Sequence, residues 1–142
     1  MARHKNMAPV RQHPEVREYM TPAPFTIAPN RMLSEAVQTM RDKHVRHLPV
    51  LDGGRVAGVL SQRDVLIIES LPGVNPDEVQ VEEAMVQDVF TVRPETPVGE
   101  AIETMIDRKL GSAIVTEDER VLGVFTTIDA LRALHHLLEQ RR

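Results

Sequence analysis

The sequence contains no cysteine and no tryptophan, and aromatic residues make up only 3% of its 142 positions. Without cysteine there can be no disulfides, no thiolate metal site and no cysteine nucleophile. The same absence fits a reducing compartment, so we expect a cytoplasmic protein. Because so few aromatic rings are available, a core drawn from the 42% of hydrophobic residues must be aliphatic.

Long hydrophobic runs and an excess of positive charge are also missing. No apolar stretch approaches the ~20 residues that span a bilayer, and residues 1–15 lack the apolar segment of a secretory signal. Their proline and polar content predicts a flexible tail. The net charge is −4, and the tail holds three basic residues against one acidic residue, so the rest of the chain carries −6. This charge argues against a nucleic-acid duplex or a membrane as a partner, although local basic patches could bind a small anion.

The chain contains an internal tandem repeat. When the sequence is shifted by 65 positions, residues 16–66 align with 81–131 without a gap, and 18 of the 51 pairs are identical. Unrelated segments would agree at roughly one position in fifteen to twenty. We therefore divide the chain into a tail (1–15), a first repeat (16–66), a connector (67–80) and a second repeat with an extended C-terminal helix (81–142).

Each repeat predicts the element order β-α-β-β-α, which places the chain in the mixed α/β class, of the α+β type. The runs FTIAP and FTVRP read as short strands, HLPVL and SAIVT as buried strands, and RVAGVL and RVLGVF as their return strands. Gly53-Gly54 suits the tight turn of the first hairpin. A unit of about 50 residues can hardly bury a core alone, so we expect the two repeats to pack together.

The helices are predicted from apolar positions at helical spacing. The matching stripes are Leu33, Ala36, Val37 and Met40 in the first repeat and Val98, Ala101, Ile102 and Met105 in the second. Thr96 and Pro97 read as the N-cap and first residue of the second of these helices. A further stripe runs along the C-terminal helix through Ala130, Leu131, Leu134, Leu137 and Leu138. It could pack within its own module or form a dimer contact, and we expect the former.

A hydroxyl and a carboxylate follow the return strand in both repeats, in GVLSQRD (58–64) and GVFTTID (123–129). On a purely structural interpretation, Ser61 with Asp64 and Thr126 with Asp129 are capping boxes at helix starts. The duplication, the preceding glycine and the position at a strand end also fit a ligand site. A carboxylate there can accept hydrogen bonds from a ribose diol, while the hydroxyl and backbone N–H groups face a phosphate.

The two repeats resemble a pair of cystathionine-β-synthase (CBS) domains, the tandem often called a Bateman module. The resemblance rests on VREYMTPAPFTIAP with VEEAMVQDVFTVRP, HVRHLPVLD with KLGSAIVTE, and GVLSQRDVL with GVFTTIDAL. It implies two repeats packed with pseudo-twofold symmetry, and clefts between them that bind AMP, ADP, ATP or S-adenosylmethionine. It further implies a homodimer and a regulatory role exerted through an effector protein.

The same resemblance implies the ligand-contacting residues. Ser61 with Asp64, and Thr126 with Asp129, would contact ribose and phosphate, and Ile27 and Val92 would line adenine pockets. The full expected set is Ile27, Arg46, His47, Pro49, Ser61, Arg63, Asp64, Val92, Arg93, Ser112, Ile114, Thr126, Thr127 and Asp129. For each cation the alternative is a solvated surface charge, and for Ile27 and Val92 it is plain core.

The two expected sites are unequal. The first repeat places Arg46, His47 and Arg63 near its motif, whereas Gly111, Ser112 and Ile128 stand at the matching positions of the second. Guanidinium groups match phosphate oxygens, so the first site is better suited to phosphate. Arg93, Arg108 and Lys109 are the cations near the second site, and Arg93, at the end of its strand, is the candidate to reach a phosphate.

Other chemistry finds little support. The six histidines show no third ligand at helical spacing, so no resident metal or required cofactor is expected, although Mg²⁺ could accompany a bound polyphosphate. No catalytic triad, nucleophile elbow or P-loop occurs, and no enzyme activity is expected. The main alternative is a protein–protein interaction module without a small ligand, in which both motifs only cap helices.

Overall fold

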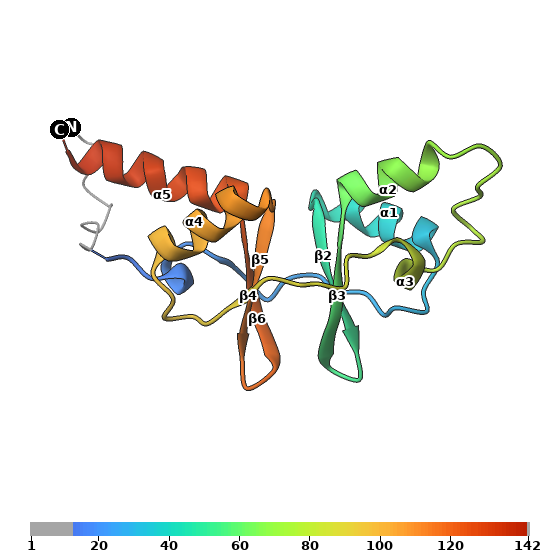
Figure 1. The fold of residues 1–142 in the computed structure, drawn as a ribbon, viewed down its shortest axis with the longest axis horizontal. Coiled ribbons are helices and arrows are strands. Elements are labelled where there is room, and N and C mark those ends of the chain that lie inside the picture. The colour runs from blue at the N-terminus through green and yellow to red at the C-terminus, as the bar shows by residue number, and fades with distance from the viewer. Residues whose placement is uncertain (1–12, 142) are drawn as a thin grey trace. The chain divides into compact units, whose positions relative to one another are not determined.

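The computed structural model describes residues 13–141, which form two compact units (Figure 1). We name each unit after the acidic residue of its motif. The Asp64 unit holds residues 23–90 and 118–121, and the Asp129 unit holds residues 13–22, 91–117 and 122–141. Both units combine helices with strands, which confirms the α/β class.

The Asp64 unit is built on the hairpin of β2 (His47–Asp52) and β3 (Arg55–Ser61). The strands are antiparallel, and His47 lies opposite Ser61. The helices of this unit are α1 (Leu33–Lys43), α2 (Gln62–Glu69) and α3 (Val81–Ala84). Figure 1 shows α1 and α2 beside the hairpin. Single bridges extend the hairpin on both sides, from Ile27 to Val50 and from Val86 to Val59.

The predicted helix stripe forms the core of this unit. Leu33, Ala36 and Met40 of α1 are buried, and Val37, which is partly buried, packs against this cluster. The other members of the cluster are Leu48, Val50, Leu60, Val65 and Val81. All are aliphatic, as the scarcity of aromatic residues requires. The helix ends where His44 adopts a left-handed conformation with a φ of 55°.

The Asp129 unit contains a four-stranded sheet in the order β1-β6-β5-β4. Its strands are β1 (Thr21–Pro22), β4 (Thr91–Val92), β5 (Ser112–Glu117) and β6 (Arg120–Thr126). A short 3₁₀ helix (Val16–Glu18) precedes β1, and the long helices are α4 (Val98–Arg108) and α5 (Thr127–Gln140). The predicted stripe of α4 is confirmed, because Val98, Ala101 and Met105 are buried.

The repeats exchange their N-terminal segments, which the predicted element order of β-α-β-β-α for each repeat did not indicate. Thr21 of the first repeat pairs with Val124 of β6, in the second. Val86 of the second repeat pairs with Val59 of β3, in the first. Both pairs keep the 65-residue offset. Each compact unit therefore closes its sheet with a segment that belongs to the other repeat.

Several element boundaries differ from the sequence predictions. The first twelve residues of the predicted tail lie outside the described residues; of the rest, Pro14 accepts a hydrogen bond from Val98 N–H (2.8 Å) and Glu15 bridges to Pro97. The N-cap of α4 is Pro97, one residue later than predicted. The hydroxyl of Thr96 instead accepts a bond from Arg93 N–H (3.0 Å). The predicted strand FTIAP contributes only the bridge at Ile27.

The apolar stripe of α5 is not buried within its own module, contrary to expectation. Leu131, Leu134, Leu137 and Leu138 keep between 44% and 53% of their surface exposed, and the buried residues of α5 are Asp129 and Ala133. The larger apolar side chains of α5 therefore remain largely outside the core.

The glycine in each GV motif accommodates the exchanged segment. A Cβ built on Gly58 would lie 2.8 Å from the Val86 carbonyl oxygen and 2.6 Å from the Met85 sulfur. On Gly123 it would lie 2.8 Å from the Thr21 carbonyl oxygen and 2.6 Å from the Met20 sulfur. The backbone and a methionine side chain of the exchanged segment therefore occupy the room that each glycine leaves.

We predict that Gly58→Ala and Gly123→Ala each lower the free energy of unfolding by about 1–3 kcal/mol, because the new methyl group meets a backbone oxygen that cannot turn aside. Gly99→Ala is the control, since a Cβ there has open space within α4 and should leave stability unchanged or slightly raised. Chemical denaturation measures all three, and equal effects of the three substitutions would contradict the packing argument.

Candidate functional site

The Ser61–Asp64 motif lies where β3 ends and α2 begins. Ser61 is the N-cap, and its hydroxyl accepts a bond from Asp64 N–H (3.2 Å). The Asp64 oxygen Oδ2 accepts bonds from the Ser61 N–H (2.9 Å) and the Ser61 hydroxyl (2.8 Å). Among the described residues, the second oxygen of Asp64 has no partner. Asp64 is partly exposed, so that oxygen can accept hydrogen bonds from outside the protein.

Three further side chains flank this motif. His47 stands opposite Ser61 in the hairpin, and the Gln62 N–H donates to the Arg46 carbonyl (2.8 Å), which ties the start of β2 to the start of α2. Arg46 and Arg63 are both exposed, and neither guanidinium has an ion pair or hydrogen bond within the described part of the chain. The structure thus places the segment that carries Arg46 and His47 next to the Ser61–Asp64 motif, which includes Arg63.

The surroundings of the His47 imidazole change its pKa. Burial lowers the pKa of His47 below its ordinary value, the nearby carboxylate of Asp64 opposes this shift, and the charge of Arg46 adds to it. A neutral imidazole is therefore favoured at this position in the folded protein.

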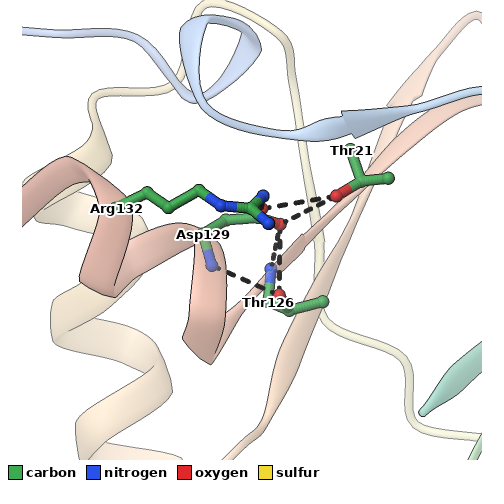
Figure 2. A network of polar contacts seen from close by, with 4 residues as sticks. All are labelled: Thr21, Thr126, Asp129 and Arg132. Atoms are coloured by element: carbon green, nitrogen blue, oxygen red, sulfur yellow. Dashed lines mark hydrogen bonds and ion pairs between the residues drawn. The ribbon is translucent and has the colours of Figure 1, made fainter. Parts of the chain in front are cut away.

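The Thr126–Asp129 motif repeats the capping box but encloses its carboxylate (Figure 2). Asp129 Oδ2 accepts bonds from the Thr126 N–H (2.9 Å) and hydroxyl (3.1 Å). The Oδ1 atom accepts a bond from Arg132 (2.9 Å), and the Thr21 hydroxyl approaches it at 3.3 Å. Asp129 is only 1% exposed, and it is the one buried charged residue of the described chain.

Four predicted ligand contacts belong to the sheets and the core. Ile27 pairs with Val50 through its backbone and is partly buried, and Val92 pairs with Val115 and is buried. The side chains of Pro49 and Ile114 are fully buried within their units. Their packing is that of core residues.

The remaining predicted contacts of the second repeat are largely engaged by the protein itself. Arg93 forms an ion pair with Glu95 (3.3 Å), which leaves it less available for a phosphate. The N–H of Thr127 donates to the Gly111 carbonyl (3.1 Å), and its hydroxyl donates to the same atom (3.3 Å). Ser112 begins β5 and is partly buried.

Thr21 and Arg132 are the contacts that the sequence analysis missed. Arg132 lies three residues after Asp129, a spacing that places two side chains on one face of a helix and could have revealed the pair. Thr21 could not have been found this way, since it is 108 residues distant and meets Asp129 only through the exchange of segments.

The described residues contain no group of three or more histidine, aspartate or glutamate side chains placed to hold a metal ion. In the same part of the chain, no helix has the length and apolar character that crossing a bilayer requires. What the Asp64 motif and the adjoining start of β2 offer is one uncommitted carboxylate oxygen and two exposed guanidinium groups, of Arg46 and Arg63, without a partner in the described part of the chain. This combination can accept bonds from a diol and donate them to an anion.

We predict that protonation of His47 lowers the free energy of unfolding in acid. The pKa of His47 in the folded protein is depressed below its ordinary value of 6.5. The contribution of His47 to the free energy of unfolding is therefore fully present above pH 6.5 and is lost as the pH falls through the folded pKa. His47→Gln should therefore flatten the dependence of Tm on pH below about 6.5. His44→Asn is the control, because it removes an exposed histidine and tolerates the left-handed conformation. An unchanged slope in His47→Gln would contradict this assignment.

Comparison with known proteins gives the family. The model of the CBS domain matches residues 16–70 and 81–136. The A-adding tRNA nucleotidyltransferase of Aquifex aeolicus is 30% identical over 129 residues, which cover 89% of this chain and 15% of that enzyme. The chain spans less than half the length of the first curated relatives that it matches.

Two solved structures share the fold. The CBS domain pair of protein MJ0100, in complex with 5′-methylthioadenosine and S-adenosyl-L-methionine, is 23% identical with a TM-score of 0.79, and the match covers 92% of this chain and 99% of that one. The protein CBSX2, in complex with AMP, is 24% identical with a TM-score of 0.77, and the match covers 90% and 99%. The two matched segments start where the repeats start and take up most of the sequence, so the chain belongs to the CBS domain family, as a pair of CBS domains.

Proposed function

We propose that this CBS pair is a regulatory module that binds an adenosyl ligand (AMP, ADP, ATP or S-adenosylmethionine) at the Asp64 motif. The observation that carries the proposal is the uncommitted Oδ1 atom of Asp64, in a motif that also carries the exposed Arg63 and whose helix start is bonded to the backbone of Arg46. Similar folds with bound adenosyl compounds support the ligand class.

The chemistry of the motif matches the two polar ends of a nucleotide. A carboxylate accepts hydrogen bonds from a ribose diol, as the acidic residue of dinucleotide-binding folds does. Exposed guanidinium groups donate in pairs to phosphate oxygens. Because S-adenosylmethionine carries no phosphate, Arg46 and Arg63 favour AMP, ADP or ATP. Mg²⁺ would enter only with a bound polyphosphate, held mainly by the nucleotide.

Regulation requires that the ligand favour one arrangement of the protein. A ligand shifts such an equilibrium only by the difference between its affinities for the two arrangements. The output would pass to an effector protein or through a second copy of the chain. The full length of the tRNA nucleotidyltransferase relative, of which this chain matches 15%, is consistent with such pairs serving as modules of larger assemblies.

Isothermal titration of the protein with AMP, ATP and S-adenosylmethionine tests the proposal. We expect binding of at least one nucleotide, and Asp64→Ala should weaken it about tenfold or more, because a charged hydrogen-bond acceptor contributes ~1.5–3 kcal/mol. Asp52→Ala is the control, since it removes an exposed carboxylate from the hairpin turn. Full affinity in folded Asp64→Ala would disprove the role of Asp64, and no binding by any of the three ligands would disprove the function.

The interaction module without a ligand remains the second candidate, and both complete capping boxes favour it. In that case Asp64 serves only α2, through its bonds to Ser61. The same variant separates the two functions. If Asp64→Ala lowers the Tm of the free protein while the wild type responds to no adenosyl ligand, capping is sufficient to explain the motif.

We further propose that the chain forms a homodimer through the apolar face of α5. Leu131, Leu134 and Leu138 lie three and four residues apart, which places them on one stripe, and each is about half exposed. A second copy presents the same stripe, so two copies could cover each other in a self-complementary contact. Burial of these leucines would remove apolar surface that the single chain leaves in water.

Sedimentation analysis of the wild type should give the mass of two chains. Leu131→Glu combined with Leu138→Glu should give the mass of one, because a charge is not tolerated within a dry apolar contact. Leu71→Glu, at an exposed leucine outside α5, is the control and should remain dimeric. A single-chain mass for the wild type, or a dimer in the double variant, would contradict the proposed interface.

A further inference from the structure

We infer that Thr21 and Arg132 hold the Asp129 carboxylate closed, so that a ribose diol binds at Asp64 and not at Asp129. The inference rests on the proposed function in assigning the ligand to Asp64. It replaces the expectation of two adenosyl sites with one site for each chain, and it gives the second motif a structural role.

The first line of argument is that the hydrogen-bonding capacity of Asp129 is already used. Its Oδ2 atom is bonded to Thr126, while Oδ1 takes the guanidinium of Arg132 at 2.9 Å and the Thr21 hydroxyl at 3.3 Å. A carboxylate has about four acceptor positions. A diol would therefore have to displace existing donors.

Access is the second line of argument. Asp129 is 1% exposed, whereas Arg132, which pairs with it, has 67% of its side-chain surface in solvent. Arg132 thus reaches the carboxylate from the solvent-exposed side of the pair. Figure 2 shows the side chains of Arg132, from α5, and Thr21, from β1, both directed at Asp129. Removing Arg132 is not sufficient to admit a ligand, because β1 pairs with β6 and its Thr21 carbonyl packs closely on Gly123. A ligand could reach the Asp129 carboxylate only if β1 moved away from β6.

The third line of argument is an internal comparison. At a shift of 65 positions, Thr21 corresponds to Val86 and Arg132 corresponds to Ile67. Neither replacement can donate a hydrogen bond from its side chain to Asp64. The bridge between Val86 and Val59 reproduces the pairing of Thr21 with Val124, so the backbone is equivalent and only the two donors are missing. These two side chains therefore account for the difference between a closed and an open carboxylate.

The closed carboxylate also connects three parts of its unit. It links β1 through Thr21, the end of β6 through Thr126, and the following turn of α5 through Arg132. A buried carboxylate with several donors is costly to disturb, because each donor that loses it must find another partner. We assign Asp129 the role of a clamp that holds the exchanged segment to α5.

Thermal melting without any ligand tests the clamp. Asp129→Asn should lower Tm by ~5 °C or more, and Asp64→Asn by clearly less, because only Asp129 is buried and bonded to other segments. The double substitution Thr21→Val with Arg132→Ile should also lower Tm. Equal shifts for Asp129→Asn and Asp64→Asn would overturn the clamp, whether or not an adenosyl ligand binds.

Titration with AMP tests the selection between the two motifs. We expect one AMP for each chain, affinity within twofold of the wild type for Asp129→Asn, and a loss of about tenfold or more for Asp64→Asn. Two bound AMP molecules, or loss of binding in Asp129→Asn alone, would overturn the inference. If the wild type binds neither AMP, ATP nor S-adenosylmethionine, the proposed function fails and with it the assignment of the ligand to Asp64, while the melting data still decide the clamp.

Transplanting the two donors provides the matched experiment. Val86→Thr with Ile67→Arg recreates the clamp at Asp64 and should weaken AMP binding about tenfold or more, since the transferred donors now compete for the carboxylate. Leu66→Arg is the control, because it adds the same charge to α2 at the neighbouring exposed position. Unchanged affinity in the folded transplant would show that these donors do not close a carboxylate.

Discussion

The pairing of an N-terminal segment of one repeat with the return strand of the other is the contact on which both units depend. Without it, β3 and β6 would each have an open edge, and Val81 and Val16 would leave the cores that they fill. Gly58 and Gly123 make the pairing possible, because any side chain there would push the incoming backbone away. The 65-residue repetition of this arrangement follows from the repetition of the sequence.

The same pairing explains how one scaffold yields two different carboxylates. It brings residue 21 beside Asp129 and residue 86 beside the equivalent motif of the first repeat. A hydroxyl at one position and an aliphatic side chain at the other then change the environment of the acid, although the capping boxes remain alike. Duplication preserved the helix cap, and substitution of its neighbours left one copy with an acceptor that faces solvent.

Much of the fold and part of the candidate site could be predicted from the sequence. The two hairpins, the amphipathic helices α1 and α4, and the helix starts at Ser61 and Thr126 follow from local periodicity, and all are present. The cluster around Asp64 was also predictable, because His47 and Ser61 are neighbours in a hairpin whose register the turn determines. The exposed leucines of α5 were not predictable, since periodicity indicates an apolar face but not what covers it.

By itself, the sequence determined the repeat, the element order, the aliphatic core and the capping motifs, because these depend on residues close together in the chain or on an internal copy. The tertiary structure alone decided which segment closes each sheet and which carboxylate stays available. Those outcomes depend on contacts across 108 residues, such as that between Thr21 and Asp129. A local sequence pattern carries no information about contacts between residues so far apart in the chain. The energy of such a contact arises only once the folded backbone has brought both groups together.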